Sequence, residues 1–498
     1  MDVSEHDEIT SVLPSDIKLL PWERLLNVIH HEPRNFGRVP SSLEQILRLT
    51  GAQLEEEIGR HQPSIASLAL EAEEAPDAPD HLHLYEVVFG RDSLRVAIDL
   101  ISSYPELARI TILMLATLQG TEYDTSREEE PGRIAHEARD QNDPIAVWLT
   151  EENGWGWPYY GSVDATPEFI RTLTAYCTLS DKNAEFLHET YTAKNGEQRQ
   201  VADALLHAVD WIMVRLKSNA EEILEYKSIL PQGIENQVWK DSPDAYHHSD
   251  GSLANHNGGI ASIEVQTTAY DALLDAAHLY EHYLDRTDEA YALRAQAEKL
   301  RATILERFWT DDKGGYFVLG TDRDELGNLR QLKIRTSNMG HTLNSRLLEG
   351  DDPYIVSRRE AIVHQILSPE MLNVSGIRTL ASDEIRFRPG AYHNGSVWLW
   401  DTHHIAKGLR RHGYYEEADD LDRRILQVID ATRIFPEYVR GDSADKPRVN
   451  TRTINVWDET YGRINKIEQP PQEVQAWTVA AILAVKKRLE RRGIFNDY

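Results

Sequence analysis

The sequence predicts an all-α protein whose main part is an (α/α)6 toroid, a closed ring of inner helices surrounded by outer helices, with a short helical extension before it. Three observations support this fold class. Long segments with apolar residues at helical spacing come in pairs joined by short turns. Strand patterns are few outside residues 314–318 and 435–465. The longer loops between the pairs contain nearly all of the Trp, Tyr and acidic clusters, as expected if one rim of a closed ring carries a site.

Helical hairpins and one closing helix are predicted along the chain. The hairpins are expected at residues 92–102 with 105–118, 167–179 with 201–217, 263–284 with 288–308, 337–348 with 353–367, and 396–411 with 414–431, and the closing helix at 471–491. No sequence motif recurs at a fixed period, so the repetition is structural. An open solenoid of helical hairpins is the alternative architecture, and the concentration of polar and aromatic loops favours the closed ring.

Residues 1–85 are predicted to form an N-terminal helical extension, and residues 86–498 the toroid. Within the extension, Ser41-Ser-Leu-Glu is typical of a capped helix start. The stretch 71–80 is acidic, contains Pro and is typical of a linker. The N-terminus shows no apolar core of a signal peptide, and no apolar run approaches the roughly 20 residues of a transmembrane helix, so we expect a cytoplasmic protein.

Composition narrows the range of partners. The 498 residues are 41% hydrophobic and 27% charged, as is ordinary for a soluble globular protein. The net charge of −29 argues against nucleic acid and anionic membranes as partners. Cys177 is the single cysteine, which excludes an intrachain disulfide and a Cys-based zinc cluster. The spacing of the His residues indicates no metal site, no cofactor is expected, and the sequence does not predict the oligomeric state.

The loop from Glu235 to Gly251 is the first candidate site. It combines four acidic residues with a Trp, a Tyr and two His, and Pro and Gly interrupt it. Flat aromatic faces stack on pyranose rings, while carboxylates bind hydroxyls or transfer protons, so this composition favours a sugar site. The alternative is a polar surface loop whose Asp and Pro residues form turns.

Further candidates lie in the loops before this one. Arg91 and Asp92 stand where a loop becomes a helix, and Asp92 is either an N-cap or part of a clamp on sugar hydroxyls. Asp164 either binds a hydroxyl or caps the helix that contains Pro167. An aromatic cluster broken by Gly and Pro forms either a stacking wall or a plug over the core, and its members are Trp155, Trp157, Tyr159 and Tyr160.

A second aromatic loop and an acidic segment follow toward the C-terminus. The loop over residues 388–401 leads directly into a helix and contributes Tyr392, His393 and Trp398. Glu437 lies in an extended stretch, far from the 235–251 loop in sequence. Two other acids are rivals for a catalytic role, Glu459 and Glu473.

Together, these segments resemble the glucosidase domain of the amylo-α-1,6-glucosidase (glycogen-debranching-enzyme-like) family, which is related in fold to glucoamylases, trehalases and processing α-glucosidases. Each segment is weak alone, but eight of them in the family's order are specific. They are Phe-Gly-Arg-Asp-Ser (89–93), Glu-Pro-Gly-Arg-Ile-Ala-His-Glu (130–137), Tyr-Tyr-Gly-Ser-Val-Asp-Ala-Thr-Pro (159–167), Asn-Gln-Val-Trp-Lys-Asp-Ser (236–242), Gly-Ile-Arg-Thr-Leu (376–380), Tyr-His-Asn-Gly-Ser-Val-Trp (392–398), Pro-Glu (436–437) and Pro-Gln-Glu-Val-Gln-Ala-Trp (471–477).

The resemblance implies an inverting glycoside hydrolase with this fold. It would cleave an α-linked terminal sugar, expected to be glucose, from a small glucoside or oligosaccharide. Asp241 falls on the family's general acid and Glu437 on its general base, while Arg91 and Asp92 match the pair that grips the sugar's outer hydroxyls. The other residues expected to bind the sugar are Trp155, Trp157, Tyr159, Tyr160, Asp164, Trp239, Lys240, Tyr392, His393, Trp398, Gln475 and Trp477.

Two departures from the family leave points open. The family's usual N-terminal β domain has no counterpart in residues 1–85, which favours a small substrate, such as a glucosylglycerate-like solute, over a branched polymer. The segment 440–469 is longer than expected, so the base stays open between Glu437 and Glu459. The alternative function is a sugar isomerase that uses histidine acid/base pairs, for which the candidates are His247, His248, His403 and His404.

Overall fold

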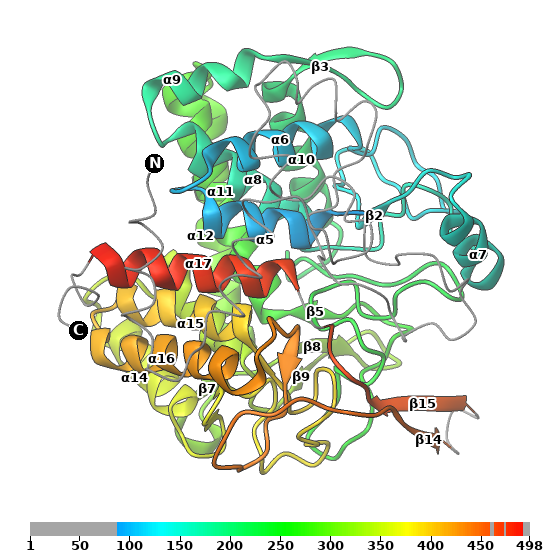
Figure 1. Cartoon of the computed structure of the whole chain (residues 1–498). Helices are drawn as coiled ribbons and strands as arrows, with labels where there is room; N and C mark the ends of the chain where they lie inside the picture. Colours follow the sequence, from blue (N-terminus) through cyan, green and yellow to red (C-terminus); the bar gives the residue numbers. More distant parts are fainter. Residues whose placement is uncertain (1–86, 459–462, 473–474, 492–498) are drawn as a thin grey trace, which may run out of the picture.

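The inner helices form a closed ring in this computed structural model (Figure 1), which describes residues 87–458, 463–472 and 475–491. Each inner helix packs against the next, and the last packs against the first. In order they are α5 (Gly90–Leu100), α8 (Ala165–Cys177), α11 (Ile263–Tyr283), α13 (Asn338–His341), α15 (Leu399–Arg411) and α17 (Ala476–Arg491). The contact between α17 and α5 confirms the predicted (α/α)6 toroid, because the terminal helices of an open solenoid do not meet.

Outer helices cover the ring from outside, each packed on the inner helix that precedes it. They are α6 (Pro105–Thr117), α10 (Val201–Leu216), α12 (Thr287–Arg307), α14 (Pro353–Ile366) and α16 (Tyr415–Thr432). The burial patterns follow from these positions. On α12 only a stripe at helical spacing is buried, including Ala290, Leu293 and Ala297, and charged residues fill the solvent face. On α11 the whole stretch 263–273 is buried, because an inner helix is covered on all sides.

Short antiparallel strands connect loops of the ring. The pair most relevant to function joins β12 (Val397–Trp398) to β13 (Tyr438–Val439), which brings two distant candidate loops together. The others are β1 (Val88–Phe89) with β2 (Glu137–Ala138), β3 (Thr190–Thr192) with β4 (Gln198–Gln200), β5 (Ala261–Ser262) with β8 (Gly320–Arg323) and β9 (Leu329–Leu332), β6 (Trp309–Thr310) with β7 (Tyr316–Phe317), β10 (Leu372–Asn373) with β11 (Gly376–Ile377), and β14 (Ile454–Asp458) with β15 (Arg463–Glu468).

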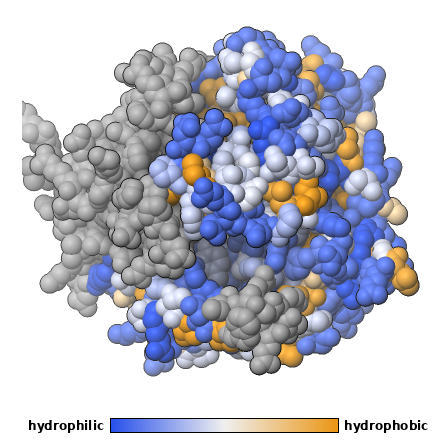
Figure 2. Space-filling view, turned by 90° about the vertical axis from the view of Figure 1, so that its right-hand side faces the viewer, coloured by the Kyte–Doolittle hydropathy of each residue, from blue (hydrophilic) through white to orange (hydrophobic). Residues whose placement is uncertain are grey.

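The candidate loops lie at the rim where inner helices begin. Strands β1, β5 and β12 lead directly into α5, α11 and α15, so the first residues of these helices face the same rim. The rim is on the right-hand side of Figure 1, and Figure 2 shows it face on. Its visible surface is mostly hydrophilic, with hydrophobic side chains scattered over it. An open polar rim above a packed ring is a common place for a binding site.

The structure corrects two predicted helices. Residues 337–348 form α13 and two short 3-10 segments, Thr342–Asn344 and Arg346–Leu348, because Ser345 is extended and its side chain accepts a hydrogen bond from Leu347 N. The closing helix starts at Ala476, not at Pro471. The residues before it are tied to another segment, since Glu437 N donates to Gln472 O and Gln475 N donates to Phe435 O.

Among the described helices of more than four residues, one was not predicted. α7 (Pro144–Asn153) projects from the rim and is capped by Asp143, whose side chain accepts from Ile145 N, and by left-handed Gly154. Other short turns are α9 (Asp181–Ala184), Glu185–His188 and Asp312–Gly314. The predicted extension at 1–85 lies outside the described residues, so the division of the chain near residue 85 stays a prediction. Among the described helices, none has the length and apolar character needed to cross a membrane.

Candidate active site

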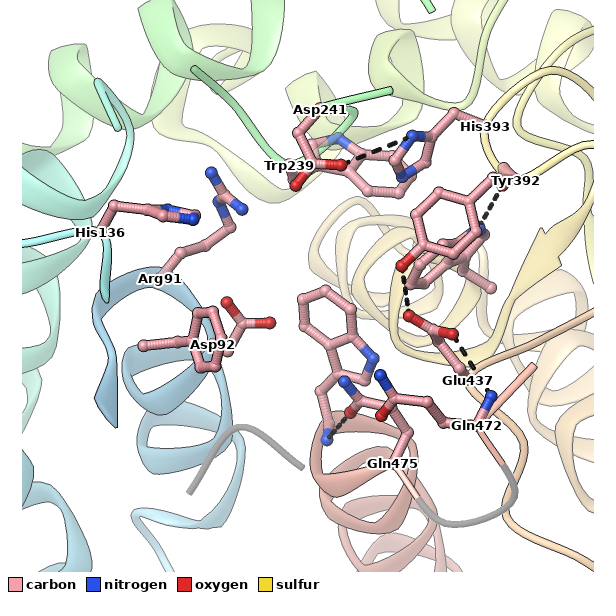
Figure 3. A pocket seen from close by; sticks show the side chains of 13 residues that line it. Arg91, Asp92, His136, Trp239, Asp241, Tyr392, His393, Glu437, Gln472 and Gln475 are labelled. Carbon is pink, nitrogen blue, oxygen red and sulfur yellow. Dashed lines mark hydrogen bonds and ion pairs between the residues drawn. The ribbon is translucent and has the colours of Figure 1, made fainter. Parts of the chain in front are cut away.

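A pocket opens at the loop rim and gathers residues from six distant parts of the chain (Figure 3). The space between its walls that no protein atom fills is about 490 Å³, which includes open solvent. It is lined by Phe89, Arg91, Asp92, His136, Trp239, Asp241, Tyr392, His393, Trp398, Glu437, Gln472, Gln475 and Trp477. The predicted acid and base therefore line the same pocket, together with eight of the predicted binding residues.

Three lining residues were not predicted, namely Phe89, His136 and Gln472. Each belongs to a segment that carried the family resemblance, at 89–93, 130–137 and 471–477. The signal was therefore present in the sequence. The aromatic and acidic composition of the loops drew attention to other side chains in the same segments.

Asp241 lies on the pocket wall, with 36% of its side chain exposed to the open space. Enclosure by the surrounding protein raises the pKa of this carboxyl to about 7; Arg91 opposes the rise, and the negative charges of Asp92 and Asp164 add to it. Asp92 belongs to α5 and Asp164 to the loop before α8, so both charges come from segments that are far from Asp241 in sequence. A carboxyl with this pKa is partly protonated near neutral pH and is suited to donate a proton.

Glu437 lies across the pocket from Asp241 (Figure 3) and is 2% exposed. The hydroxyl of Tyr392 donates a hydrogen bond to Glu437 Oε1, and the backbone N–H of Gln472 lies 3.5 Å from Oε2. These donors favour the ionised carboxylate. The guanidinium of Arg440, in the same segment, pairs with Asp442 and Glu468.

The rival acids Glu459 and Glu473 lie outside the described residues. Their positions relative to the pocket are therefore not described, and the choice of Glu437 as the base stays a prediction.

Arg91 and Asp92, in the first turn of α5, form the wall that lies opposite Glu437. Asp92 is not the N-cap, since Phe89 holds that position without a side-chain bond. Arg91 Nε donates to Asp164 Oδ2 at 2.6 Å, so Asp164 fixes the guanidinium rather than capping α8. Burial raises the pKa of Asp92 to about 6, although the charge of Arg91 lowers it. This wall offers a fixed cation beside a carboxylate, an arrangement that suits pairs of sugar hydroxyls.

Several pocket residues have a buried nitrogen that lacks a hydrogen-bond partner within the described part of the chain. The atoms are Arg91 Nη2, His136 Nδ1, Trp239 Nε1, His393 Nε2 and Trp477 Nε1. Arginine and indole nitrogens only donate. A buried donor without a partner is unfavourable, so this set indicates a site that is completed by a ligand or water with many acceptor oxygens. Hydroxyl groups have the acceptor capacity that these nitrogens lack and the donor capacity that suits the carboxyl groups of Asp92, Asp241 and Glu437.

The remaining predicted residues do not line this pocket. The 155–160 cluster forms the plug that was the alternative interpretation. Trp155 stacks on Tyr159 with ring centroids 4.2 Å apart, and the buried Tyr160 donates to Leu118 O. Trp157 Nε1 donates to Thr150 Oγ1. The cluster supports the site from behind, because Glu137 pairs with Tyr159 and the ring of His136 packs on the ring of Tyr159.

Lys240 also points away from the pocket. Its Nζ donates to Thr379 O at 2.6 Å and is 5.1 Å from the centroid of the Trp239 ring. Burial lowers the pKa of Lys240 to about 7, although the charges of Asp401 and Glu264 raise it. The side chain therefore anchors the loop that carries Asp241 to the loop that contains Thr379.

The histidines proposed for an isomerase lie away from the pocket. His403 is 3.7 Å from Asp99, and His404 contacts Arg95 and the ring of His341. His248 is 3.1 Å from Asp322, while His247 is fully buried. These contacts are structural, and the pocket contains His136 and His393 instead. Among the described residues, no group of His, Cys, Asp and Glu has a geometry that would hold a metal ion.

Residues 157–452 match the family described as "Mannosylglycerate hydrolase MGH1-like glycoside hydrolase domain". This match names a different family from the amylo-α-1,6-glucosidase family that the motifs resemble. A mannosylglycerate hydrolase of Rubrobacter radiotolerans is 28% identical over 170 residues, which are 33% of this chain. The match covers 36% of that relative's length, so the chain spans only about a third of it.

Solved structures of a GH63 mannosylglycerate hydrolase from Thermus thermophilus share the fold. The complex with Tris superposes with a TM-score of 0.53 at 14% identity, covering 89% of this chain and 100% of the other. The complex with Tris and D-glycerate gives 0.52 at 14%, covering 88% and 98%. A complex with glucose gives 0.53 at 14%, covering 88% and 99%. At this identity the likeness concerns the fold alone.

Proposed function

The chain belongs to the family of mannosylglycerate hydrolase MGH1-like glycoside hydrolase domains, and from this premise we propose that it is an inverting hydrolase that releases an α-linked hexose from a small hexosyl glycerate. The observation that carries the proposal is the placing of Asp241 and Glu437 on opposite sides of one pocket, in different environments. Inverting hydrolysis requires one proton-donating and one ionised carboxyl group.

In the proposed reaction, Asp241 donates its proton to the glycosidic oxygen as the bond from the anomeric carbon to that oxygen breaks. Glu437 accepts a proton from a water molecule that attacks the anomeric carbon from the opposite face. The products are the β-anomer of the free sugar and the alcohol. The environments match these roles, since the pKa of Asp241 is raised to about 7 while Tyr392 donates a hydrogen bond to Glu437.

Two observations favour a terminal sugar on a small molecule. Arg91 and Asp92 form the wall that faces Glu437 and would grip the sugar's outer hydroxyls, while the unpartnered nitrogens would serve its other oxygens. Relatives are named for mannosylglycerate, and one related structure contains D-glycerate, which supports glycerate as the aglycone. The hexose is proposed to be mannose, with glucose as the alternative.

A substrate panel tests this function. We expect the purified protein to hydrolyse α-mannosylglycerate or α-glucosylglycerate with a kcat/KM at least about tenfold above that for an α-1,6-linked glucose disaccharide. The panel includes α-mannosylglycerol and α-glucosylglycerol, which lack the carboxylate of the glycerate, as controls. Preference for the α-1,6-linked disaccharide would instead support the debranching-type activity that the motifs resemble.

Activity is expected to fall as the pH rises above about 7. A general acid works only while it is protonated, so the active fraction decreases about tenfold for each pH unit above its pKa, and the pKa of Asp241 is raised to about 7. Asp92→Asn should move this alkaline limb to lower pH, because it removes a negative charge that helps to raise that pKa. The pH dependence of kcat/KM of both proteins is the measurement. An alkaline limb that stays unmoved in Asp92→Asn would contradict the role of Asp241.

A further inference from the structure

His393 lies beside Asp241 in the pocket and is held from several sides. It is 2% exposed, and its Nδ1 is 4.0 Å from Asp241 Oδ1. The imidazole stacks on Trp398, with centroids 5.3 Å apart and planes 18° apart. The ring of Trp239 meets it edge-on at 5.4 Å, and the ring of Tyr392 lies at 4.5 Å. These contacts fix the ring plane and therefore the directions of both ring nitrogens.

The contacts of Nδ1 define which nitrogen carries the proton. The backbone N–H of Ser242 donates to Nδ1 at 3.3 Å, and Ser242 Oγ lies at 2.9 Å. A backbone N–H only donates, so Nδ1 is an acceptor and the proton of the neutral ring is on Nε2. Burial holds the pKa of His393 well below its usual range, and the positive charges of Lys240 and Arg91 add to this effect. The imidazole is thus a neutral donor with a fixed direction.

The donating nitrogen has no partner within the described ranges of the chain. Nε2 of His393 is buried and makes no hydrogen bond there. Nδ1 already makes hydrogen bonds with Ser242. Rotating the ring to give Nε2 a partner would break those bonds. An N–H group that is buried, fixed and unpartnered in a pocket wall is suited to an acceptor oxygen of the ligand.

We propose that the Nε2–H of His393 donates a hydrogen bond to a substrate oxygen that flanks the cleaved glycosidic bond. The inference rests on the proposed function, in which Asp241 protonates the glycosidic oxygen and His393 is its neighbour. Two oxygens of the same chemistry flank that bond. One is the 2-hydroxyl of the sugar, and the other is the carboxylate of the aglycone. A substrate that lacks the bonded oxygen would leave the N–H unpaired and would be discriminated against.

Three variants of His393 separate the donor from the shape of the ring. His393→Gln keeps an amide N–H near the position of Nε2, His393→Asn keeps an amide near Nδ1 only, and His393→Phe keeps the ring without either nitrogen. On α-mannosylglycerate we expect the kcat/KM of the Gln variant to stay within about tenfold of wild type. The kcat/KM of the Asn and Phe variants is expected to be lower by a further factor of about 10 to 100, the size of effect that the loss of one buried hydrogen bond produces.

A matched control is available on the outer ring of helices. His207 of α10 also has a ring nitrogen without a partner in the described part of the structure, but it lies away from the pocket. His207→Phe is expected to leave kcat/KM unchanged. Thermal unfolding of all variants shows whether His393→Phe and His207→Phe are folded at the assay temperature.

Substrate analogues identify the acceptor. The ratio of kcat/KM between wild type and His393→Phe is measured for α-mannosylglycerate, its 2-deoxy analogue and α-mannosylglycerol. A ratio that drops to about 1 on the 2-deoxy analogue assigns the bond to the 2-hydroxyl, and a drop on the glycerol glycoside assigns it to the carboxylate. An equal loss on all three substrates, or no loss on the first, overturns the proposal. If wild type hydrolyses none of the three, the proposed function itself fails.

Discussion

Asp241→Asn is expected to lower kcat on the glycerate glycoside by about 10³-fold or more while the protein stays folded, because an amide does not deliver the proton that the leaving alkoxide needs. The loss should be far smaller on the corresponding α-glycosyl fluoride, since fluoride leaves without a proton. Steady-state rates on both substrates are the measurement. Only a missing general acid produces this split between leaving groups.

Asp244→Asn is the matched control, with the same change in the same loop at a carboxyl outside the pocket lining. It should retain nearly full activity on both substrates. If Asp241→Asn hydrolysed the glycerate glycoside at the wild-type rate, or lost equally on the fluoride, the assignment of Asp241 as the acid would be wrong.

Glu437→Gln is expected to lower kcat by a similar factor, about 10³-fold or more, on both the glycerate glycoside and the fluoride. Water must be activated whichever group leaves, so the absence of a leaving-group effect distinguishes the base from the acid. Glu468→Gln is the control, since Glu468, at the end of β15, pairs with Arg440 and does not line the pocket.

The competing base is tested in the same assay. Glu459→Gln is expected to keep most of the activity. Full activity in Glu437→Gln together with loss in Glu459→Gln would move the base to Glu459 and would leave Asp241 as the acid.

Local sequence patterns predict the helices well because the 3.6-residue period reflects which face each helix buries. The hairpin of α11 and α12 was predicted within a few residues at each end. Helix starts set by tertiary contacts were not predictable in this way. Helix α17 begins only at Ala476 because the backbone of Gln472 and Gln475 bonds to residues 435–437, and that partner segment is far away in sequence.

The site shows the same division between local and tertiary information. The motif segments predicted that Asp241 and Glu437 belong together. They did not show that the charges of Asp92 and Asp164 raise the pKa of Asp241, because this effect arises only when α5 and the loop before α8 come near the 235–251 loop. The 155–160 cluster illustrates the limit, since a stacking wall and a core plug have the same composition. In the structure the rings of Trp155 and Tyr159 stack on each other, and Tyr159 and Tyr160 are fully buried, as in a plug.

The stereochemistry of the first product tests the central claim most directly. ¹H NMR spectra recorded in the first minutes of α-mannosylglycerate hydrolysis, before the free sugar equilibrates, distinguish the two anomers. If Asp241 protonates the leaving oxygen while Glu437 activates water on the opposite face, the β-anomer appears first and the α-anomer grows in later by mutarotation. Initial release of the α-anomer would mean retention of configuration and would contradict the account.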